Sequence, residues 1–387
     1  MAVKVLIGFA ESLAAIESAW CLRAAGYEVV AFSRTGRRPP LAAARGITVH
    51  PVPAPEAGVV ACVAAVRSLV AVERPAAVLP LDDAALLVCD RATDAVDGRI
   101  LGTPIAGATA AAARLALNKS EQIALAEKAG IPVPPTGSTE PPPGVGPWIV
   151  KSAMAAVERD GRLGRPAGAI AREAGDVAAV VAGLGGPALV QPLVEGIGEG
   201  MFGIAIGGEG YALSAHRRVR MMNPRGSGSS ACRSIPVDPD LVGPVQRFVA
   251  EAGWHGIFMI ELLRDASGQP WFMELNGRTW GSMALARHRG LPYPVWAVEA
   301  ALDPTWRPPA VAEAPHLVCR HAGREMVHLL AVLRGARGVD AGRWPGRSST
   351  LRAMLRRERG TRWYHADERG VLLRDTWRTV ADQVRRR

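Results

Sequence analysis

The residues of this chain best suited to do chemistry lie in one stretch where two carboxylates and an amide follow apolar runs. Glu261 follows the apolar residues 256–260, and Glu274 and Asn276 come after the turn-forming residues 265–268. Two apolar runs around such a turn predict an antiparallel hairpin. Burying two carboxylates requires a neutralising cation, and oxygen ligands suit Mg²⁺ beside phosphate groups. The alternative is a solvated strand face whose charges point into water.

The alternation of side chains along the two predicted strands adds three neighbours to this cation site. Met259 is expected on the face of Glu261, and Phe272 is expected on the face that carries Glu274 and Asn276. Arg278 follows two residues after Asn276 and could reach the same phosphate.

Lysine is scarce in this sequence, which makes each lysine informative. Only four of the 46 basic residues are lysines, so the other 42 are arginines. Lys119 lies near the start of a predicted helix, and Lys151 ends the predicted strand 148–151. A compact ammonium on a flexible stem is a good phosphate partner. The alternative for each lysine is an ordinary surface position.

A third group of residues could bind an anion. On an extended strand, His216, Arg218 and Arg220 would fall on one face and form a cationic edge. The Gly- and Ser-rich residues 226–230 that follow could present backbone N–H groups to phosphate oxygens. The alternative is an exposed arginine strand followed by a loop without a role.

The elements that must position these residues indicate an α/β domain followed by an α+β region. Over residues 1–105, short apolar runs alternate with helical stretches, which predicts a Rossmann-like parallel sheet. The turn after its first strand lacks the GxGxxG pattern, so dinucleotide binding is not supported. Residues 109–129 predict a helix interrupted near Asn118, and two hairpins are expected over residues 201–216 and 256–275. Beyond residue 358 the sequence predicts a basic tail and no further helix.

Charge and cysteine content exclude some classes of protein. Residues 306–387 contain 18 arginines and 8 acidic residues, which accounts for the whole formal charge of +10, so the preceding part is formally neutral. Nucleic acid is therefore not expected as a partner. Five scattered cysteines argue against a disulfide framework or a cysteine zinc site. We read no signal peptide or membrane span, so we expect a cytoplasmic protein without a membrane partner.

The order of these features resembles the ATP-grasp superfamily, in its carboxylate–amine ligase and carbamoyl-phosphate-synthetase-like branches. The resemblance covers about residues 1–300, and the ordered set of motifs carries it. The matching segments are Asn118-Lys119, Ile149-Val150-Lys151, residues 189–196, residues 225–229, Glu261, and Glu274-Leu275-Asn276-Gly277-Arg278. The resemblance implies a Rossmann-like domain over residues 1–105, a two-lobed ATP-grasp domain over 106–305 and a small basic C-terminal segment over 306–387.

The family also implies a role for individual residues. Lys119 and Lys151 would bind the nucleotide phosphates, the backbone from Gln191 to Val194 would meet adenine, and Glu199 would hold the ribose. The residues implied to close over the triphosphate are Gly226, Ser227 and Gly228. Glu261, Glu274 and Asn276 would hold Mg²⁺, with Mn²⁺ as the alternative, and Met259 and Phe272 would line the nucleotide. The predicted catalytic residues are Arg278, Lys151 and Arg218. Apart from the resemblance, the cationic edge of His216, Arg218 and Arg220 is expected to bind the substrate carboxylate.

The implied activity is an ADP-forming ligase that activates a carboxylate as an acyl phosphate and joins it to an amine. A carboxylate needs this activation because oxide is a poor leaving group, and the chemistry is mainly positioning and charge neutralisation. Two alternatives are an ATP-grasp phosphotransferase or carboxyphosphate-forming enzyme, and a non-catalytic nucleotide-binding module. The expected partners are the small carboxylate and amine substrates, and we allow for a homodimer.

Overall fold

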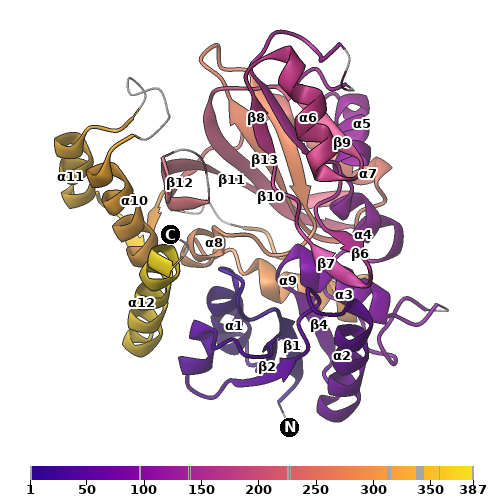
Figure 1. Ribbon diagram of the computed structural model, residues 1–387. Coiled ribbons are helices and arrows are strands. Elements are labelled where there is room, and N and C mark those ends of the chain that lie inside the picture. The colour runs from indigo at the N-terminus through magenta and orange to yellow at the C-terminus, as the bar shows by residue number, and fades with distance from the viewer. Residues whose placement is uncertain are drawn as a thin grey trace.

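The N-terminal domain is a parallel sheet covered by helices on both faces. The computed structural model describes residues 2–95, 97–137, 139, 141–224, 226, 228–311, 315–336, 344–356 and 358–385. Four parallel strands lie in the order β3-β2-β1-β4, with α1 packed on one face and α2 and α3 on the other (Figure 1). The elements are β1 (Lys4–Gly8), α1 (Ala15–Ala24), β2 (Glu28–Arg34), η1 (Pro40–Ala43), β3 (Thr48–Val52), α2 (Val59–Glu73), β4 (Ala77–Pro80) and α3 (Asp83–Ala92).

A small lobe follows, built on a three-stranded antiparallel sheet in the order β8-β5-β9 with the separate hairpin β6-β7. Asn118 ends one helix and caps the next, because its side-chain oxygen accepts the backbone N–H groups of Ser120 and Glu121. The elements are α4 (Ala110–Leu117), α5 (Lys119–Ala129), β5 (Trp148–Ser152), β6 (Val157–Arg159), β7 (Arg162–Gly164), β8 (Ala169–Ala171), α6 (Ala174–Leu184) and β9 (Ala188–Pro192).

The largest sheet has seven strands in the order β14-β13-β10-β11-β12-β15-β16. Its turn between β13 and β14 is closed by Asp265, whose Oδ1 accepts the N–H groups of Ser267 and Gln269 at 2.9 and 3.0 Å. The elements are β10 (Ile197–Ile206), β11 (Glu209–Met221), β12 (Ser229–Ile235), α7 (Pro239–Glu251), β13 (Gly256–Arg264), β14 (Pro270–Asn276), α8 (Met283–His288), α9 (Tyr293–Leu302), β15 (Val318–Arg320) and β16 (Thr361–Trp363).

Two cores cover the two faces of this large sheet. On one face, which we call the domain face, Phe202, Ile257 and Met259 pack against Trp280, α9 and the N-terminal domain. On the other face, which we call the helix face, Phe258, Ile260 and Leu262 pack against α4, α5 and α7. The Glu261 side chain continues the domain face beyond Met259, where the apolar core gives way to polar groups.

The C-terminal segment joins the body through two strands and a terminal helix. Its helices are α10 (Ala322–Arg334), α11 (Arg347–Leu355) and α12 (Arg369–Arg385), the last of which packs on α10 and η1 (Figure 1). Val371 of α12 is fully buried in the core that also contains α1 and β1 of the N-terminal domain. Among the residues that the structure describes, no helix combines the length and apolar composition needed to cross a membrane.

The expected hairpins, the parallel sheet and the helix break at Asn118 agree with the structure. The edge strand β3 and the helix α12 are among the elements that the sequence did not predict, as are α3, β12, α8, α9, β15 and β16. β3 contains His50 and Pro51 and is half-exposed, so it lacks a continuous apolar run. α12 is rich in arginine and buries only a few of its residues, so its sequence resembles that of a solvated tail.

Candidate active site

Glu261 and Glu274 lie directly opposite each other across the strands β13 and β14. Directly paired residues project to the same face of a sheet with their Cβ atoms about 5 Å apart. Asn276 pairs with Met259, so it also projects to the domain face. The hairpin therefore brings all three predicted metal ligands together, in agreement with the alternation along β13 and at the end of β14.

The close approach of β14 to its neighbours depends on Gly277. A Cβ atom there would lie 2.8 Å from the Cβ of Ala116 in α4 and 2.8 Å from the Trp254 ring. The glycine lets the end of β14 pack directly on α4, and α4 leads through Asn118 into Lys119.

Each of the two carboxylates has its own cation. Arg218 on β11 donates to Glu261 at 2.5 Å, and Lys119 lies 2.8 Å from Glu274. Burial raises the pKa of Glu261, and Arg218 opposes that rise only in part. Burial acts in the same direction on Glu274, but the charge of Lys119 and its hydrogen bond outweigh it and lower the pKa of Glu274. Glu274 is therefore ionised at neutral pH beside a second carboxyl group.

Lys151 and Arg278 add further positive charge around this pair. Burial, and then the charge of Lys119, lower the pKa of Lys151 on β5 to about 8. The Arg278 guanidinium donates to Asp83 of the N-terminal domain at 2.9 Å. Burial favours the neutral form of Asp83, but Arg278 and Arg165 outweigh it and hold the pKa of Asp83 below its usual value. The site thus draws its charges from both lobes and from the N-terminal domain.

The donor set fits a magnesium ion. Glu261 and Glu274 supply carboxylate oxygens on one face, and Asn276 is 4% exposed beside them. The Asn276 Nδ2 atom is buried without a hydrogen-bond partner among the described residues, so this amide is not committed to holding the backbone. Hard oxygen ligands of this kind, with room for phosphate oxygens, are those that Mg²⁺ prefers.

A β-bulge places Phe272 away from this group, so its predicted face is wrong. Glu261 pairs with Glu274, but the next residue, Leu262, pairs with Phe272 and leaves Met273 as the extra residue. Phe272 consequently points to the helix face, where its ring lies 6.0 Å from that of Phe248. Met259 does share the face of Glu261, but it is 3% exposed and lies within the core of that face.

A second bulge separates the three residues expected to form a cationic edge. Arg218 pairs with Cys232 and Arg220 with Ala231, so Val219 is the extra residue and Arg220 turns to the helix face. There Arg220 forms an ion pair with Glu325 of α10. Of the three, Arg218 alone contacts Glu261.

His216 shares the face of Arg218 but lies deep in the core. Its Nδ1 atom is 2.7 Å from the Ser282 hydroxyl, and burial, with the charge of Arg218, lowers the pKa of His216 to about 3. His216 is therefore neutral at neutral pH and supplies no charge for a carboxylate.

Glu199 does not lie with the metal ligands either. It pairs with Leu262 and Arg217, so it projects to the helix face. Its two oxygens accept from Arg217 at 2.8 Å and Arg264 at 2.9 Å. It lines a separate cavity of about 380 Å³ with Asp238 and other residues. We therefore do not retain Glu199 as a ribose ligand.

The segment predicted to meet adenine, Gln191 to Val194, lies where β9 of the small lobe leads into β10 of the large sheet. Gln191 is 1% exposed, and its Nε2 donates to Thr136 at 2.7 Å, which leaves its Oε1 without a hydrogen-bond partner in the described chain. The backbone N–H of Leu193 donates to Pro147 at 2.8 Å. Val194 is partly buried just beyond it, so the connection is anchored at its start, and contact with adenine stays a prediction.

The glycine-rich loop after β11 lies against α10. Gly226 donates to Asn223 at 3.0 Å, and a Cβ atom at Gly228 would lie 2.7 Å from the Arg324 guanidinium. Ser227 lies outside the described residues. Closure of this loop over a triphosphate stays a prediction.

Gln122 is a positioning residue that the sequence analysis missed. Its side-chain oxygen accepts the N–H of Leu275 at 2.9 Å, and its Nε2 donates to the carbonyls of Leu115 and Ala116 at 3.0 and 2.8 Å. Because Leu275 stands between Glu274 and Asn276, Gln122 ties the metal-ligand strand to the helices that carry Lys119. Gln122 follows the polar residues Lys119, Ser120 and Glu121 of α5, so the local sequence carried no signal of its role.

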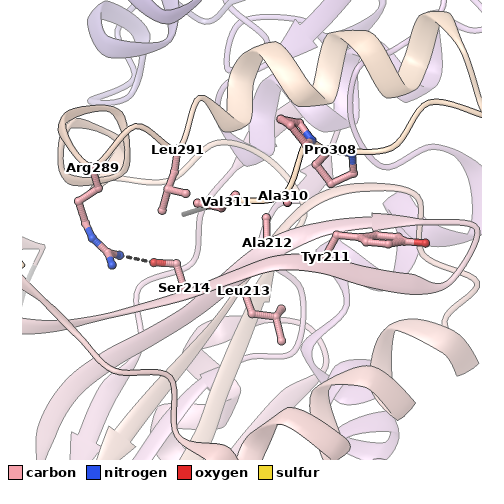
Figure 2. A pocket seen from close by; sticks show the side chains of 10 residues that line it. Tyr211, Ala212, Leu213, Ser214, Arg289, Leu291, Pro308, Ala310 and Val311 are labelled. Carbon is pink, nitrogen blue, oxygen red and sulfur yellow. Dashed lines mark hydrogen bonds between the residues drawn. The ribbon is translucent and has the colours of Figure 1, made fainter. Parts of the chain in front are cut away.

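A different cavity is lined by none of the charged residues described above. It has a volume of about 430 Å³ and is lined by β11, the residues after α8 and the segment 308–311. Figure 2 shows Arg289 donating to Ser214 at its edge. No residue predicted to bind nucleotide or metal lines this cavity.

Comparison with known proteins supports a fold but identifies no close relative. No family model and no curated protein sequence matches the chain. L-amino acid ligase from Bacillus licheniformis has a similar structure (TM-score 0.59, 16% identity, covering 78% of this chain and 74% of that one). A biotin carboxylase–β,γ-ATP complex from Campylobacter jejuni (0.61, 13%, 81% and 74%) and N5-carboxyaminoimidazole synthetase from Staphylococcus aureus (0.56, 12%, 82% and 81%) are also similar.

Proposed function

We propose that this chain, whose fold is that of the ATP-grasp enzymes, is an ADP-forming ligase that joins a carboxylate to an amine. The observation that carries the proposal is the Glu261–Glu274 pair with Asn276 on one face of β13 and β14, ringed by Arg218, Lys119 and other cations. If these carboxylates simply pointed into water, they would not be partly buried and would not each need a paired cation. The L-amino acid ligase among the similar structures supports the choice of reaction.

In this proposal, different residues bind different phosphate groups of ATP. Lys119 and Lys151 bind phosphate oxygens, and Arg278, held by Asp83, faces the phosphoryl group that is transferred. Glu261, Glu274 and Asn276 hold Mg²⁺, which when bound neutralises the charge of the phosphate oxygens. The connection from Gln191 to Val194 binds adenine between the lobes.

The proposed reaction has two steps. A carboxylate oxygen of the substrate attacks the γ-phosphorus of ATP, the bond to ADP breaks, and an acyl phosphate forms. The amine nitrogen then attacks the acyl carbon, phosphate leaves, and the nitrogen loses a proton to give the amide. Arg218 is suited to orient the substrate carboxylate because its guanidinium lies beside Glu261 and its side chain is only 22% exposed. Arg278 stabilises the charge on the transferred phosphoryl group.

Trapping the intermediate tests this function. The full chain is incubated with ATP, Mg²⁺, pooled carboxylates and hydroxylamine, which converts an acyl phosphate to a hydroxamate. We expect hydroxamate and ADP in equal amounts, and amide in place of hydroxamate when amines are supplied. ADP release that requires bicarbonate alone would favour a carboxyphosphate-forming enzyme, while tight ATP binding without ADP release would favour a nucleotide-binding module.

A further inference from the structure

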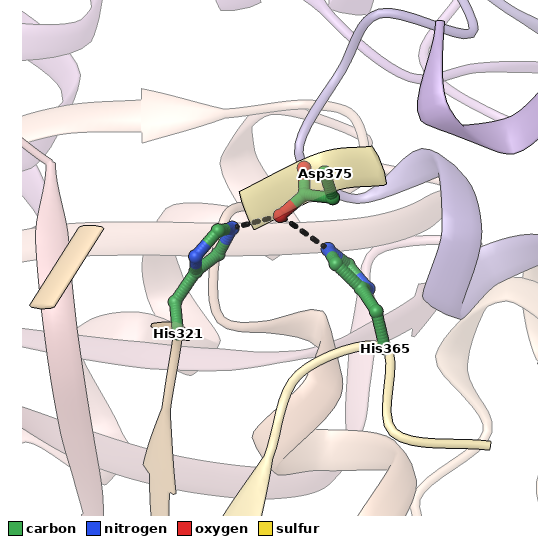
Figure 3. Close-up of side chains that lie close together, drawn as sticks. All are labelled: His321, His365 and Asp375. Atoms are coloured by element: carbon green, nitrogen blue, oxygen red, sulfur yellow. Dashed lines mark ion pairs between the residues drawn. The ribbon is translucent and has the colours of Figure 1, made fainter. Parts of the chain in front are cut away.

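Two histidines and an aspartate from the C-terminal segment converge at a point outside the proposed ATP site. His321 precedes α10, His365 follows β16, and Asp375 lies on α12. Figure 3 shows both imidazole rings directing a nitrogen toward the same Asp375 oxygen. The distances from Asp375 Oδ2 are 3.1 Å to His321 Nε2 and 4.0 Å to His365 Nε2. One potential ligand atom of each residue lies within 4.8 Å of the others.

All three facing atoms are buried but unsatisfied. His321, His365 and Asp375 are 2%, 1% and 8% exposed. The atoms His321 Nε2, His365 Nε2 and Asp375 Oδ2 have no hydrogen-bond partner in the part of the chain that the structure describes. The 3.1 Å approach of His321 is therefore a close contact of poor hydrogen-bond geometry. Buried polar atoms are nearly always paired, so three orphans aimed at one point indicate a missing partner.

The other ring nitrogen of His365 faces a second carboxylate. This Nδ1 atom lies 3.0 Å from Glu17 Oε1. This carboxylate–histidine arrangement is the one that orients metal-binding imidazoles.

We propose that His321, His365 and Asp375 bind a divalent transition-metal ion of the zinc class. Two imidazole nitrogens and one carboxylate oxygen suit such an ion, and they leave a further position for water. That position opens into a cavity of about 700 Å³ lined by the three ligands, residues 10–13 and α12. Zinc bonds of about 2.1 Å place tetrahedral ligands roughly 3.4 Å apart, so His365 moves slightly inward when the ion binds.

Two neighbouring interactions act against the ion and are weaker than coordination. The N–H of Arg324 caps α10 through His321 Nδ1 at 3.3 Å, and this long contact is given up when Nδ1 takes the proton. The Arg324 guanidinium is a nearby cation, but its NH1 donates to Ser229 O at 3.1 Å.

Cobalt and zinc titrations of the untagged, chelator-treated full chain test the site. We expect one equivalent of Co²⁺ to bind with visible absorption bands and to be displaced by Zn²⁺. His365→Ala and Asp375→Asn should each weaken binding by about 100-fold, and Glu17→Gln, which touches no metal, by about tenfold. His50→Ala is the matched control. It removes a histidine of β3 that pairs with Glu73 of α2, and it should bind cobalt as the natural chain does.

Two comparisons keep the test decisive. Glu261→Gln should leave cobalt binding unchanged, which separates this site from the proposed Mg²⁺ site. Circular dichroism identifies variants that fail to fold, and in that event the Glu17→Gln titration decides. The proposal is overturned if the natural chain shows no saturable binding of one equivalent, or if the ligand variants or Glu17→Gln bind cobalt as tightly as the control.

Discussion

At the scale of single residues, the two carboxylates opposite each other on β13 and β14 are not equivalent. Glu274 is ionised because Lys119 lies 2.8 Å away, whereas burial raises the pKa of Glu261 beside Arg218. A cation between them would stabilise both charges at once. This asymmetry makes Glu261 the carboxyl group whose charge depends most on a bound metal.

Neutralising Glu274 tests its role directly. Glu274→Gln keeps the shape of the side chain but removes its charge, so we expect ADP formation to fall by about 100-fold or more. Steady-state ADP release across a range of Mg²⁺ concentrations measures the effect. The control is Glu251→Gln, which removes a carboxylate paired with the exposed Lys128. Equal activity of the two variants would refute a metal role for Glu274.

The lowered pKa of Lys151 predicts that nucleotide binding depends on pH. Burial and the charge of Lys119 lower the pKa of Lys151 to about 8, so the ammonium is present below that pH and is lost above it. ATP affinity, measured calorimetrically, should therefore decline above pH 8 with a slope approaching tenfold per pH unit. Lys151→Arg keeps its charge over this range. If the ATP affinity of Lys151→Arg declines above pH 8 with the same slope, a group other than Lys151 is responsible.

At the scale of elements, two bulges decide which side chains reach the site. The extra residue Met273 sends Phe272 to the helix face, and Val219 does the same for Arg220. Strict alternation predicted the opposite in both cases. A bulge forms where packing on both faces of the sheet is better satisfied by one additional residue, and the local sequence around Met273 and Val219 carries no sign of it.

The position of Phe272 makes a prediction that separates structure from binding. Phe272→Ala removes a fully buried ring from the core with Phe248, so we expect the free energy of unfolding to fall by about 3–5 kcal/mol. ATP affinity of the folded variant should change little, because the side chain faces away from Glu261. Urea unfolding and ATP titration measure the two quantities. A large loss of ATP affinity together with normal stability would instead indicate that Phe272 contacts the nucleotide.

At the scale of the whole molecule, one buried network joins the N-terminal domain to the C-terminal segment. Arg287 on α8 contacts Glu17 of α1 at 2.5 Å and Asp367 at 2.9 Å. Glu17 is fully buried and also accepts from His365. Removing one partner from a buried ion pair leaves an uncompensated charge, so this network is expected to hold the segment in place.

Arg287→Met tests that attachment. We expect a loss of about 3–5 kcal/mol of stability and faster proteolysis in the C-terminal segment, because Glu17 and Asp367 lose their shared cation. The folded-state pKa of Glu17 is about 2, against 4.5 in its ordinary state. Its contribution to stability is therefore complete above pH 4.5 and declines as the pH falls toward 2. Urea unfolding of the variant should show a weaker decline over this range.

The sequence by itself determined the parallel sheet, the hairpins, the capped helix break at Asn118 and the group of Glu261, Glu274, Asn276 and Lys119. These features depend on turns, caps and periods that are local to the chain. Tertiary structure alone decided the faces of Phe272 and Arg220, the burial of His216 and the pairing of Glu199 with two arginines. It also brought His321, His365 and Asp375 together. Their positions result from packing between segments far apart in sequence, and no local sequence pattern encodes that packing.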